Sequence, residues 1–262
     1  MEKAPVLYDL HESVATLTLN RPDNRNSMTP DLLDAFADAV QRVRKSQGVR
    51  CVVLAGSGTT FSSGADFRSQ IQRDDGSGRQ PNERSFAMYT PFLSVLDVEV
   101  PVIGALSGHA VGGGFGLALL CDIRVATRDA RYGANFARIG LHPGLGISYL
   151  LPRLVGVPRA AELLFTGRLF NGDEGVEMGL FTRALPHADV LPEAQRLAAE
   201  IAANAPIAVR MMKQSLYRGL ACDVRAAAWQ EAYAQSATVQ TEDAHEGIAA
   251  LLEKRPPLFK NC

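Results

Sequence analysis

Ser107-Gly108-His109-Ala110-Val111-Gly112-Gly113-Gly114-Phe115-Gly116 directly follows a short apolar run, Val102 to Leu106. The run is typical of a strand buried on both faces of a sheet, and the apolar residues after Gly116 favour a helix. Three consecutive glycines at a helix start let a ligand approach the backbone closely and leave N–H groups without partners. Such N–H groups, at the positive end of a helix, suit an anion or a polarised carbonyl oxygen.

The segments before this turn have the pattern of an α/β protein. Val14 to Leu19 alternates as a strand does, and Val6 to Leu10 is placed to pair with it. Thr29-Pro30-Asp31 carries the signals of a helix start, with proline at the first helical position and an acid in the first turn. Cys51 to Ala55 is another buried strand, and a second glycine turn follows it, Phe61-Ser62-Ser63-Gly64-Ala65-Asp66. Apolar strands alternating with helices predict right-handed crossovers and the α/β class.

The remaining segments are a polar stretch and a helical tail. Ser69 to Ser85 is polar, charged and glycine-containing, which predicts a mobile loop. From about Leu191 onward the pattern predicts only helices, at Leu191 to Ala203, Pro206 to Arg218, Val224 to Val239 and Thr241 to Glu253. We therefore expect a core at residues 1–190 and a C-terminal helical region at residues 191–262 that serves for docking or oligomerisation.

Composition excludes several classes of partner. Lys+Arg 27 against Asp+Glu 28 gives a formal net charge of -1, so no bulk charge favours nucleic acid or an anionic membrane. The four cysteines (Cys51, Cys121, Cys222 and Cys262) are scattered, without metal-ligand spacing, and indicate reduced thiols rather than a metal site. No signal-like segment and no membrane-spanning apolar run are seen, so we expect a cytoplasmic protein without a membrane partner.

Other glycine motifs do not fit the triple-glycine turn. A dinucleotide fingerprint starting at Gly112 needs a glycine where Leu117 stands, and no Gly-Lys-Ser/Thr phosphate loop or Gly-x-Ser-x-Gly elbow occurs. On its own, the triple glycine is equally compatible with tight strand–helix packing.

Taken together, the two glycine turns and their flanking motifs resemble the crotonase (enoyl-CoA hydratase/isomerase) superfamily. The matching motifs, in the family's order, are Leu19-Asn20-Arg21-Pro22, Asn26-Ser27-Met28, Gly64-Ala65-Asp66, Pro101-Val102-Ile103, Ser107-Gly108-x-Ala110-Val111-Gly112-Gly113-Gly114, Cys121-Asp122, Pro143-Gly144-Leu145-Gly146, Leu151-Pro152-Arg153-Leu154-Val155-Gly156, Ala205-Pro206 and Glu253-Lys254-Arg255-Pro256-Pro257-x-Phe259. They extend over almost the whole chain.

This resemblance implies a spiral of ββα units with a C-terminal helical trimerisation region, and a homotrimer or homohexamer. It also implies that the backbone N–H groups of Ala65 and Gly113 form an oxyanion hole for an acyl-CoA thioester. No separate cofactor is expected, because CoA is part of the substrate or ligand. The residues that the resemblance suggests for contacts with the adenine or phosphates of CoA are Asn24, Arg25, Arg68 and Lys260, although each basic side chain is equally compatible with a solvated surface charge.

The chain departs from the family at the catalytic acids. Hydratases of this family have one glutamate at the position of Gly116 and a second at the position of Phe136, and the two work on one water molecule. Because neither residue here can move a proton, we expect weak hydration of simple enoyl-CoAs. Gly116 and Phe136 also predict a drier and roomier pocket.

Few other side chains are available as an acid or base. His142 precedes the Pro143-Gly144 turn, and histidine is the usual acid or base near neutral pH, but a histidine in such a turn is more often structural. His109 is expected to hydrogen-bond the backbone, and Tyr89 to reach an acyl group or pack in the core. Two hypotheses stay open: an enzyme of the crotonase type with an atypical acid or base, and a non-catalytic acyl-CoA-binding protein.

Overall fold

The computed structural model describes residues 4–65, 81–139, 141–219, 241–253, 255, 257–260 and 262. Its strands are β1 (Val6–His11), β2 (Val14–Leu19), β3 (Cys51–Gly56), β4 (Thr60–Ser62), β5 (Val102–Leu106), β6 (His109–Val111), β7 (Ile123–Thr127), β8 (Tyr132–Gly133) and β9 (Arg183–Leu185). Its α-helices are α1 (Pro30–Lys45), α2 (Pro81–Leu93), α3 (Gly113–Leu119), α4 (Ile147–Val155), α5 (Val157–Thr166), α6 (Gly172–Glu177), α7 (His187–Ala202), α8 (Pro206–Gly219) and α10 (Glu242–Glu253). Short 3₁₀ helices are η1 (Pro22–Asn24), η3 (Ser94–Asp97) and η4 (Asn135–Ile139).

The strands form two sheets that repeat one unit along the chain. The larger sheet has the order β1-β2-β3-β5-β7-β9, and the smaller has the order β4-β6-β8. Three times in succession, a strand of the large sheet is followed by a short strand of the small sheet and then by a helix: β3-β4-α2, β5-β6-α3 and β7-β8-η4. Apart from the antiparallel β1–β2 hairpin, these strands pair in parallel. The chain thus winds as a spiral of ββα units, and the predicted fold is confirmed.

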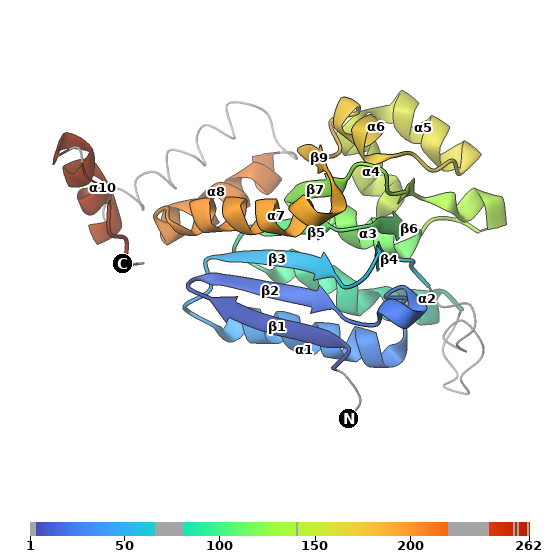
Figure 1. Ribbon diagram of the computed structural model, residues 1–262, viewed down its shortest axis with the longest axis horizontal. Coiled ribbons are helices and arrows are strands. Elements are labelled where there is room, and N and C mark those ends of the chain that lie inside the picture. The colour runs from blue at the N-terminus through green and yellow to red at the C-terminus, as the bar shows by residue number, and fades with distance from the viewer. Residues whose placement is uncertain are drawn as a thin grey trace.

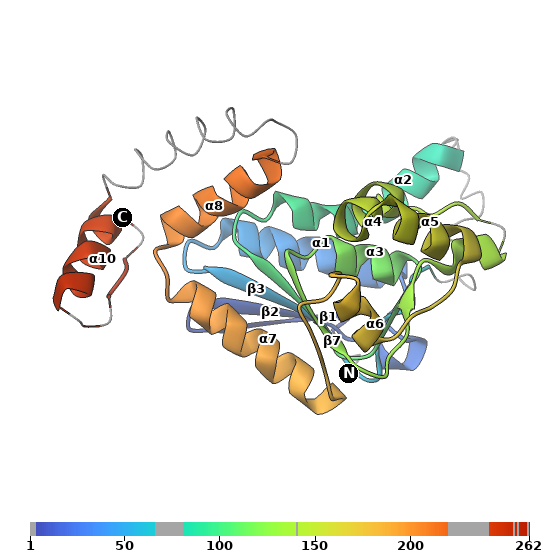
Figure 2. The ribbon, with the colours of Figure 1, turned by 90° about the horizontal axis from the view of Figure 1, so that it is seen from above.

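The large sheet is buried between helices on its two faces (Figures 1 and 2). Alternate residues of β3 serve the two faces, as the two-residue period of a strand requires. Val52 and Leu54 join the cluster that includes Phe36 of α1, whereas Val53 packs in the cluster that includes Ala194 of α7. All six residues of β3 are buried, which is why its sequence shows an unbroken apolar run.

Two predicted segments have different bounds in the structure. Pro81 to Ser85, expected to end a loop, instead form the first turn of α2, where a proline opens the helix and Glu83 supplies an acid. The residues of that loop from 66 to 80 lie outside the described part of the chain. The first helix expected in the tail begins at His187 rather than Leu191 and packs on the large sheet. The division at residues 190 and 191 stays a prediction about domains.

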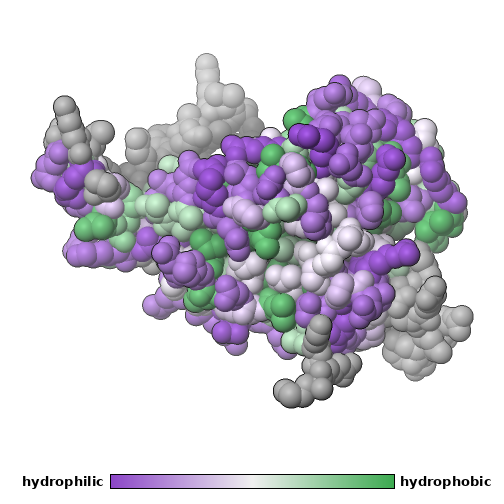
Figure 3. All heavy atoms as spheres, in the orientation of Figure 1, coloured by the Kyte–Doolittle hydropathy of each residue, from purple (hydrophilic) through white to green (hydrophobic). Residues whose placement is uncertain are grey.

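The last helices lie toward one end of the molecule, and α10 lies well away from the sheet in both ribbon views (Figures 1 and 2). Two apolar side chains of α8, Met212 and Leu216, are 67% and 63% exposed. On the face shown in Figure 3, hydrophilic residues predominate and hydrophobic residues form small separate patches. No helix within the described residues is long and apolar enough to cross a membrane.

Candidate functional site

The two glycine turns of the sequence meet in space. They follow β4 and β6, neighbouring strands of the small sheet that run in parallel. A methyl group on Gly64, which has a φ of +82°, would lie 2.7 Å from the nitrogen of Gly113. Backbone contacts of the same kind occur nearby, because a Cβ on Gly108 would lie 2.1 Å from the Thr59 oxygen and one on Gly114 would lie 2.2 Å from the Ser62 oxygen. The first two ββα units therefore touch backbone to backbone.

Among the described residues, two N–H groups at this junction have no acceptor. Gly113 is the first residue of α3, and Gly112 precedes it with a φ of 58°. Ala65 is bridged to Met28, and Gly64 accepts a hydrogen bond of 2.9 Å from the Met28 N–H. In the described part of the chain, neither the N–H of Ala65 nor that of Gly113 has a hydrogen-bond acceptor. Two such donors side by side suit an oxygen that carries negative charge.

A buried asparagine holds the first turn in place. Asn26 is fully buried, and its side-chain amide donates to the Ser57 oxygen at 3.0 Å and to the Thr60 oxygen at 2.7 Å. Its own main-chain oxygen accepts from the Ser62 hydroxyl at 2.8 Å. The loop after β2 is thereby fixed to β4, two residues before Gly64. These bonds satisfy buried polar groups and position the turn that ends in Ala65.

The side chains nearest to the second turn are mostly apolar. Phe136, on η4, is 6% exposed, and its ring Cζ lies 3.8 Å from the position of a Cβ on Gly112. A Cβ on Gly116 would lie 2.8 Å from Leu145 Cδ2. Neither Gly116 nor Phe136 supplies a carboxylate here. Leu145 fills the space beside Gly116, so the expectation of a roomier pocket is wrong at this position.

Leu145 is the residue of this wall that the sequence alone did not reveal. It is 3% exposed and has a φ of 56°, a left-handed conformation that is uncommon for a leucine. The turn before it packs on α2, because a Cβ on Gly144 would lie 2.5 Å from the Tyr89 hydroxyl oxygen. Burial raises the pKa of Tyr89, so its hydroxyl stays protonated near neutral pH. The glycines on both sides of Leu145 were the only signal of an unusual turn.

Within the described residues, neither histidine candidate has a contact that indicates an acid or base at Ala65 or Gly113. His142 is exposed, and its Nδ1 lies 2.7 Å from the Pro143 oxygen. Within the described residues no contact joins His142 to Gly113 or Ala65. His109 accepts a hydrogen bond of 2.8 Å from the Arg131 N–H at its Nδ1, which confirms its expected backbone role.

The residues proposed to contact CoA are not all together in one chain. Asn24 and Arg25 lie beside the first turn, since the Arg25 oxygen accepts from the Ser63 N–H at 3.0 Å. Lys260 lies near the opposite end of the sheet. Phe259, the residue before it, accepts a hydrogen bond of 3.0 Å at its main-chain oxygen from Arg50, which stands just before the start of β3. A strand of six residues, about 20 Å, separates these ends. Arg68 lies outside the described residues.

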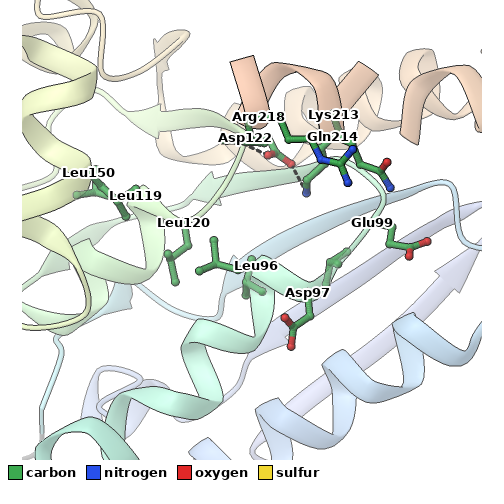
Figure 4. Close-up of a pocket in the computed structure, with 13 residues that line it drawn as sticks. Leu96, Asp97, Glu99, Leu119, Leu120, Asp122, Leu150, Lys213, Gln214 and Arg218 are labelled. Carbon is green, nitrogen blue, oxygen red and sulfur yellow. Dashed lines mark hydrogen bonds and ion pairs between the residues drawn. The ribbon is translucent and has the colours of Figure 1, made fainter. Parts of the chain in front are cut away.

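A separate groove of about 440 Å³ lies between α8, η3 and the end of α3 (Figure 4). Its polar side is held by Asp122, which accepts from Lys213 Nζ at 2.8 Å and from the Tyr217 hydroxyl at 2.5 Å. Its other side is made by leucines, among them Leu96 and Leu120. None of the predicted site residues lines this groove. In the described part of the chain, no group of three His, Cys, Asp or Glu side chains is placed to hold a metal ion.

Comparison with known proteins places the chain in a family. The family model for enoyl-CoA hydratase/isomerase matches residues 9–262. The YngF protein of Bacillus subtilis is 36% identical over 252 residues, which cover 95% of each chain. The crotonyl-CoA hydratase of Syntrophomonas wolfei is 34% identical over 255 residues, or 97% of each chain.

Structural similarity agrees with these matches. The crystal structure of an enoyl-CoA hydratase from Bacillus anthracis superposes with a TM-score of 0.93 at 32% identity, and covers 98% of this chain and 100% of that one. The fold, the paired glycine turns and the match along nearly the whole sequence lead to one assignment. The chain belongs to the enoyl-CoA hydratase/isomerase family, whose members act on acyl-CoA thioesters.

Proposed function

We propose that this protein binds acyl-CoA thioesters, with the N–H groups of Ala65 and Gly113 donating to the thioester oxygen. The observation that supports this most is the contact of the Gly64 turn with Gly113, beside two N–H groups without acceptors in the described residues. Donors fixed in this way stabilise the negative charge that an enolate places on the oxygen. Loss of one such donor typically costs about 2.7–4 kcal/mol of transition-state stabilisation.

The same proposal includes weak hydration of simple enoyl-CoAs such as crotonyl-CoA. Water addition needs one group to remove a proton from water and another to deliver one to carbon, and each is worth roughly 10²–10⁴ in rate. Gly116 and Phe136 supply neither group. A kcat for crotonyl-CoA comparable to that of a glutamate-bearing relative contradicts this part of the proposal, and His142→Ala is then the first variant to examine.

A second candidate is a cytoplasmic acyl-CoA-binding protein without catalysis. The exposed position of His142, with its ring bonded to its own neighbour, favours this candidate over an enzyme that uses His142. Turnover of any acyl-CoA in a panel of saturated, unsaturated and carboxylated thioesters excludes it.

The affinity for acyl-CoA relative to free CoA tests the oxyanion hole. We expect butyryl-CoA to bind more tightly than CoA in isothermal titration calorimetry, and equal affinities contradict the proposal. Gly113→Pro removes one donor, and proline is well accommodated at the first position of a helix. We expect it to weaken butyryl-CoA binding roughly two- to tenfold, the value of one hydrogen bond, and to leave CoA binding unchanged.

Gly113→Ala is the matched control for this variant. It adds a Cβ at the same place, 2.6 Å from the flexible Met28 Sδ, but keeps the N–H. If Gly113→Ala weakens butyryl-CoA binding as much as Gly113→Pro does, the loss comes from crowding of Met28 and the donor role of Gly113 is contradicted.

We further propose that the chain assembles as a homotrimer or homohexamer through its C-terminal helices. The exposed Met212 and Leu216 of α8 support this, because apolar side chains at helical spacing favour burial against a partner. A second copy also offers a way for Lys260 to reach a CoA held near Arg25. Light scattering that shows a monomer at micromolar concentration contradicts the assembly.

A further inference from the structure

One buried methionine bridges the two glycine turns. Met28 is fully buried, its main-chain N–H donates to the Gly64 oxygen at 2.9 Å, and its backbone forms a parallel bridge with Ala65. Its side chain reaches the other turn, because a Cβ on Gly113 would lie 2.6 Å from the Met28 sulfur and 3.8 Å from its Cε. Met28 therefore contacts both turns, the first through its main chain and the second through its thioether.

The main-chain side of this contact is firmly held. Asn26, two residues before Met28, donates through its side-chain amide to the Thr60 oxygen, and its main-chain oxygen accepts from the Ser62 hydroxyl. A buried polar network whose hydrogen bonds are all made is rigid. The backbone of Met28 and the turn that ends in Ala65 are thus held together, and the Met28 side chain extends from this base to the start of α3.

The start of α3 has no side chain of its own beside this sulfur. Residues 112–114 are all glycine, so the Met28 thioether fills the place that a side chain at position 113 would take. The direction of the Gly113 N–H follows the first turn of α3, and a hydrogen bond weakens steeply when its donor is misaligned. When buried side-chain atoms are removed, the surrounding structure relaxes partly into the space that they leave. Shortening the Met28 side chain should therefore let the start of α3 move and turn this donor away.

We propose that Met28 is a positioning residue of the oxyanion hole, and that its thioether keeps the N–H groups of Ala65 and Gly113 aimed at one oxygen. The inference rests on the thioester site proposed above. Met28 acts through Gly113, so this role requires no contact between Met28 and the thioester. What matters is the reach of the side chain. Leucine ends at the δ position, where the methionine sulfur lies, whereas alanine ends at the β position.

The affinity for butyryl-CoA relative to CoA measures how well the donors are aligned. In isothermal titration calorimetry we expect Met28→Ala to lower this affinity ratio roughly two- to tenfold, the value of one hydrogen bond. Met28→Leu conserves the volume of the side chain and should keep the ratio within about twofold of the unmodified protein. Circular dichroism and light scattering establish that the variants keep the fold and assembly. If Met28→Ala does not fold, Met28→Val, which ends at the γ position, replaces it in the same experiments.

Infrared difference spectroscopy follows the thioester carbonyl itself. Hydrogen bonds to a carbonyl oxygen lower its stretching frequency, so the band of bound butyryl-CoA should lie lower in the unmodified protein than in water. In Met28→Ala this band should shift back toward its position in water, and in Met28→Leu it should not. A residue that only stabilises the fold does not change the frequency of a bound carbonyl.

Val43→Ala is the matched control for lost packing. Val43 is a buried residue of α1, about 20 Å along that helix from Pro30, and its truncation also leaves a space in the core. We expect this variant to lower the urea midpoint and to leave the affinity ratio and the carbonyl band unchanged. If Val43→Ala lowers the ratio as much as Met28→Ala does, the effect comes from general loss of packing and the inference is overturned.

Gly113→Ala supplies the missing support from the other side. In the Met28→Ala background its added Cβ lies 2.6 Å from the former place of the sulfur and fills part of the space. The double variant should therefore recover part of the lost preference for butyryl-CoA. A double variant with the same affinity ratio as Met28→Ala contradicts the support of α3 by this side chain.

A folded Met28→Ala protein with an unchanged affinity ratio and carbonyl band overturns the inference, while the thioester site itself stands. If the unmodified protein binds butyryl-CoA no better than CoA, the proposed function fails, and the role of Met28 fails with it.

Discussion

Replacement of Gly116 by alanine sets two known effects against each other. In a helix interior alanine is favoured over glycine by about 1 kcal/mol, so propensity alone predicts a stabilised protein. In this structure the added Cβ would lie 2.8 Å from Leu145 Cδ2 and 3.1 Å from Leu145 Cβ, well inside the ordinary contact distance. Because Leu145 is buried and its Cβ cannot rotate away, we expect Gly116→Ala to lower the free energy of unfolding by about 1–3 kcal/mol.

The second half of the test removes the opposing side chain. Leu145→Gly alone should cost about 2–5 kcal/mol for the lost buried side chain, less about 1 kcal/mol for relief of the left-handed backbone. In the double variant the added methyl group no longer meets a side chain. The two changes should therefore cost less together than the sum of the separate costs, by about 0.5–3 kcal/mol.

Urea unfolding at a fixed protomer concentration measures all three variants. Gly48→Ala is the matched control, because its added Cβ would meet nothing closer than Ser46 Oγ at 4.0 Å, and we expect a change within about 0.5 kcal/mol. Additive costs in the double variant, or a Gly116→Ala protein as stable as Gly48→Ala, refute the assignment of Leu145 to the space beside Gly116.

The contact between Gly116 and Leu145 also affects whether two added glutamates can give hydratase activity. Gly116→Glu with Phe136→Glu returns both acids, yet Leu145 still occupies the place of the first one. We expect the pair alone to remain a poor hydratase of crotonyl-CoA, and the triple variant with Leu145→Gly to exceed it by roughly 10²-fold or more. Equal rates for the two contradict a blocking role for Leu145.

Three further outcomes follow from other parts of the structure. Arg124 is buried and donates to two main-chain carbonyls. Arg124→Leu should therefore lower the free energy of unfolding in urea by about 1–3 kcal/mol for each acceptor left unsatisfied. A decrease of less than about 0.5 kcal/mol contradicts this expectation. Burial raises the pKa of Cys51 and of Cys121 from 9.0 to about 12, so the folded state holds these two protons more tightly than the unfolded state. The free energy of unfolding should therefore be unaffected by these thiols below about pH 9 and should fall between about pH 9 and pH 12. Over that pH range, the double alanine variant should show a smaller fall in its urea midpoint. Met212→Glu with Leu216→Glu should dissociate the proposed oligomer in light scattering, and an unchanged mass excludes this face of α8 as the interface.

The sequence predicted those features that depend on local pattern. The run Cys51 to Ala55 indicated a buried strand because both faces of β3 are covered, and the strand was found at Cys51–Gly56. The start of α1 at Pro30 followed from its proline and acid. The start of α2 at Pro81 carries similar signals, but the polar residues before it favoured a loop.

Features that depend on tertiary packing were not predictable in this way. No sequence pattern specifies that Leu145 turns inward with a positive φ while His142, three residues earlier, is exposed. The backbone of Leu145 is fixed by burial against Gly116, which lies in a different ββα unit of the chain. Likewise, the position of Lys260 away from Arg25 depends on where the C-terminal segment packs.

The close contacts at Gly108 and Gly114 have a consequence for how this scaffold tolerates change. There the first two ββα units meet backbone to backbone, so the spacing of the proposed donors, the N–H groups of Ala65 and Gly113, depends on how closely these units pack. Any larger residue at Gly108 or Gly114 would push the two ββα units apart without itself contacting a ligand. The walls of the pocket come instead from η4 and from the turn before α4, which are later in the chain. Acidic or basic side chains can therefore be substituted on these walls while the proposed N–H donors of Ala65 and Gly113 stay in place.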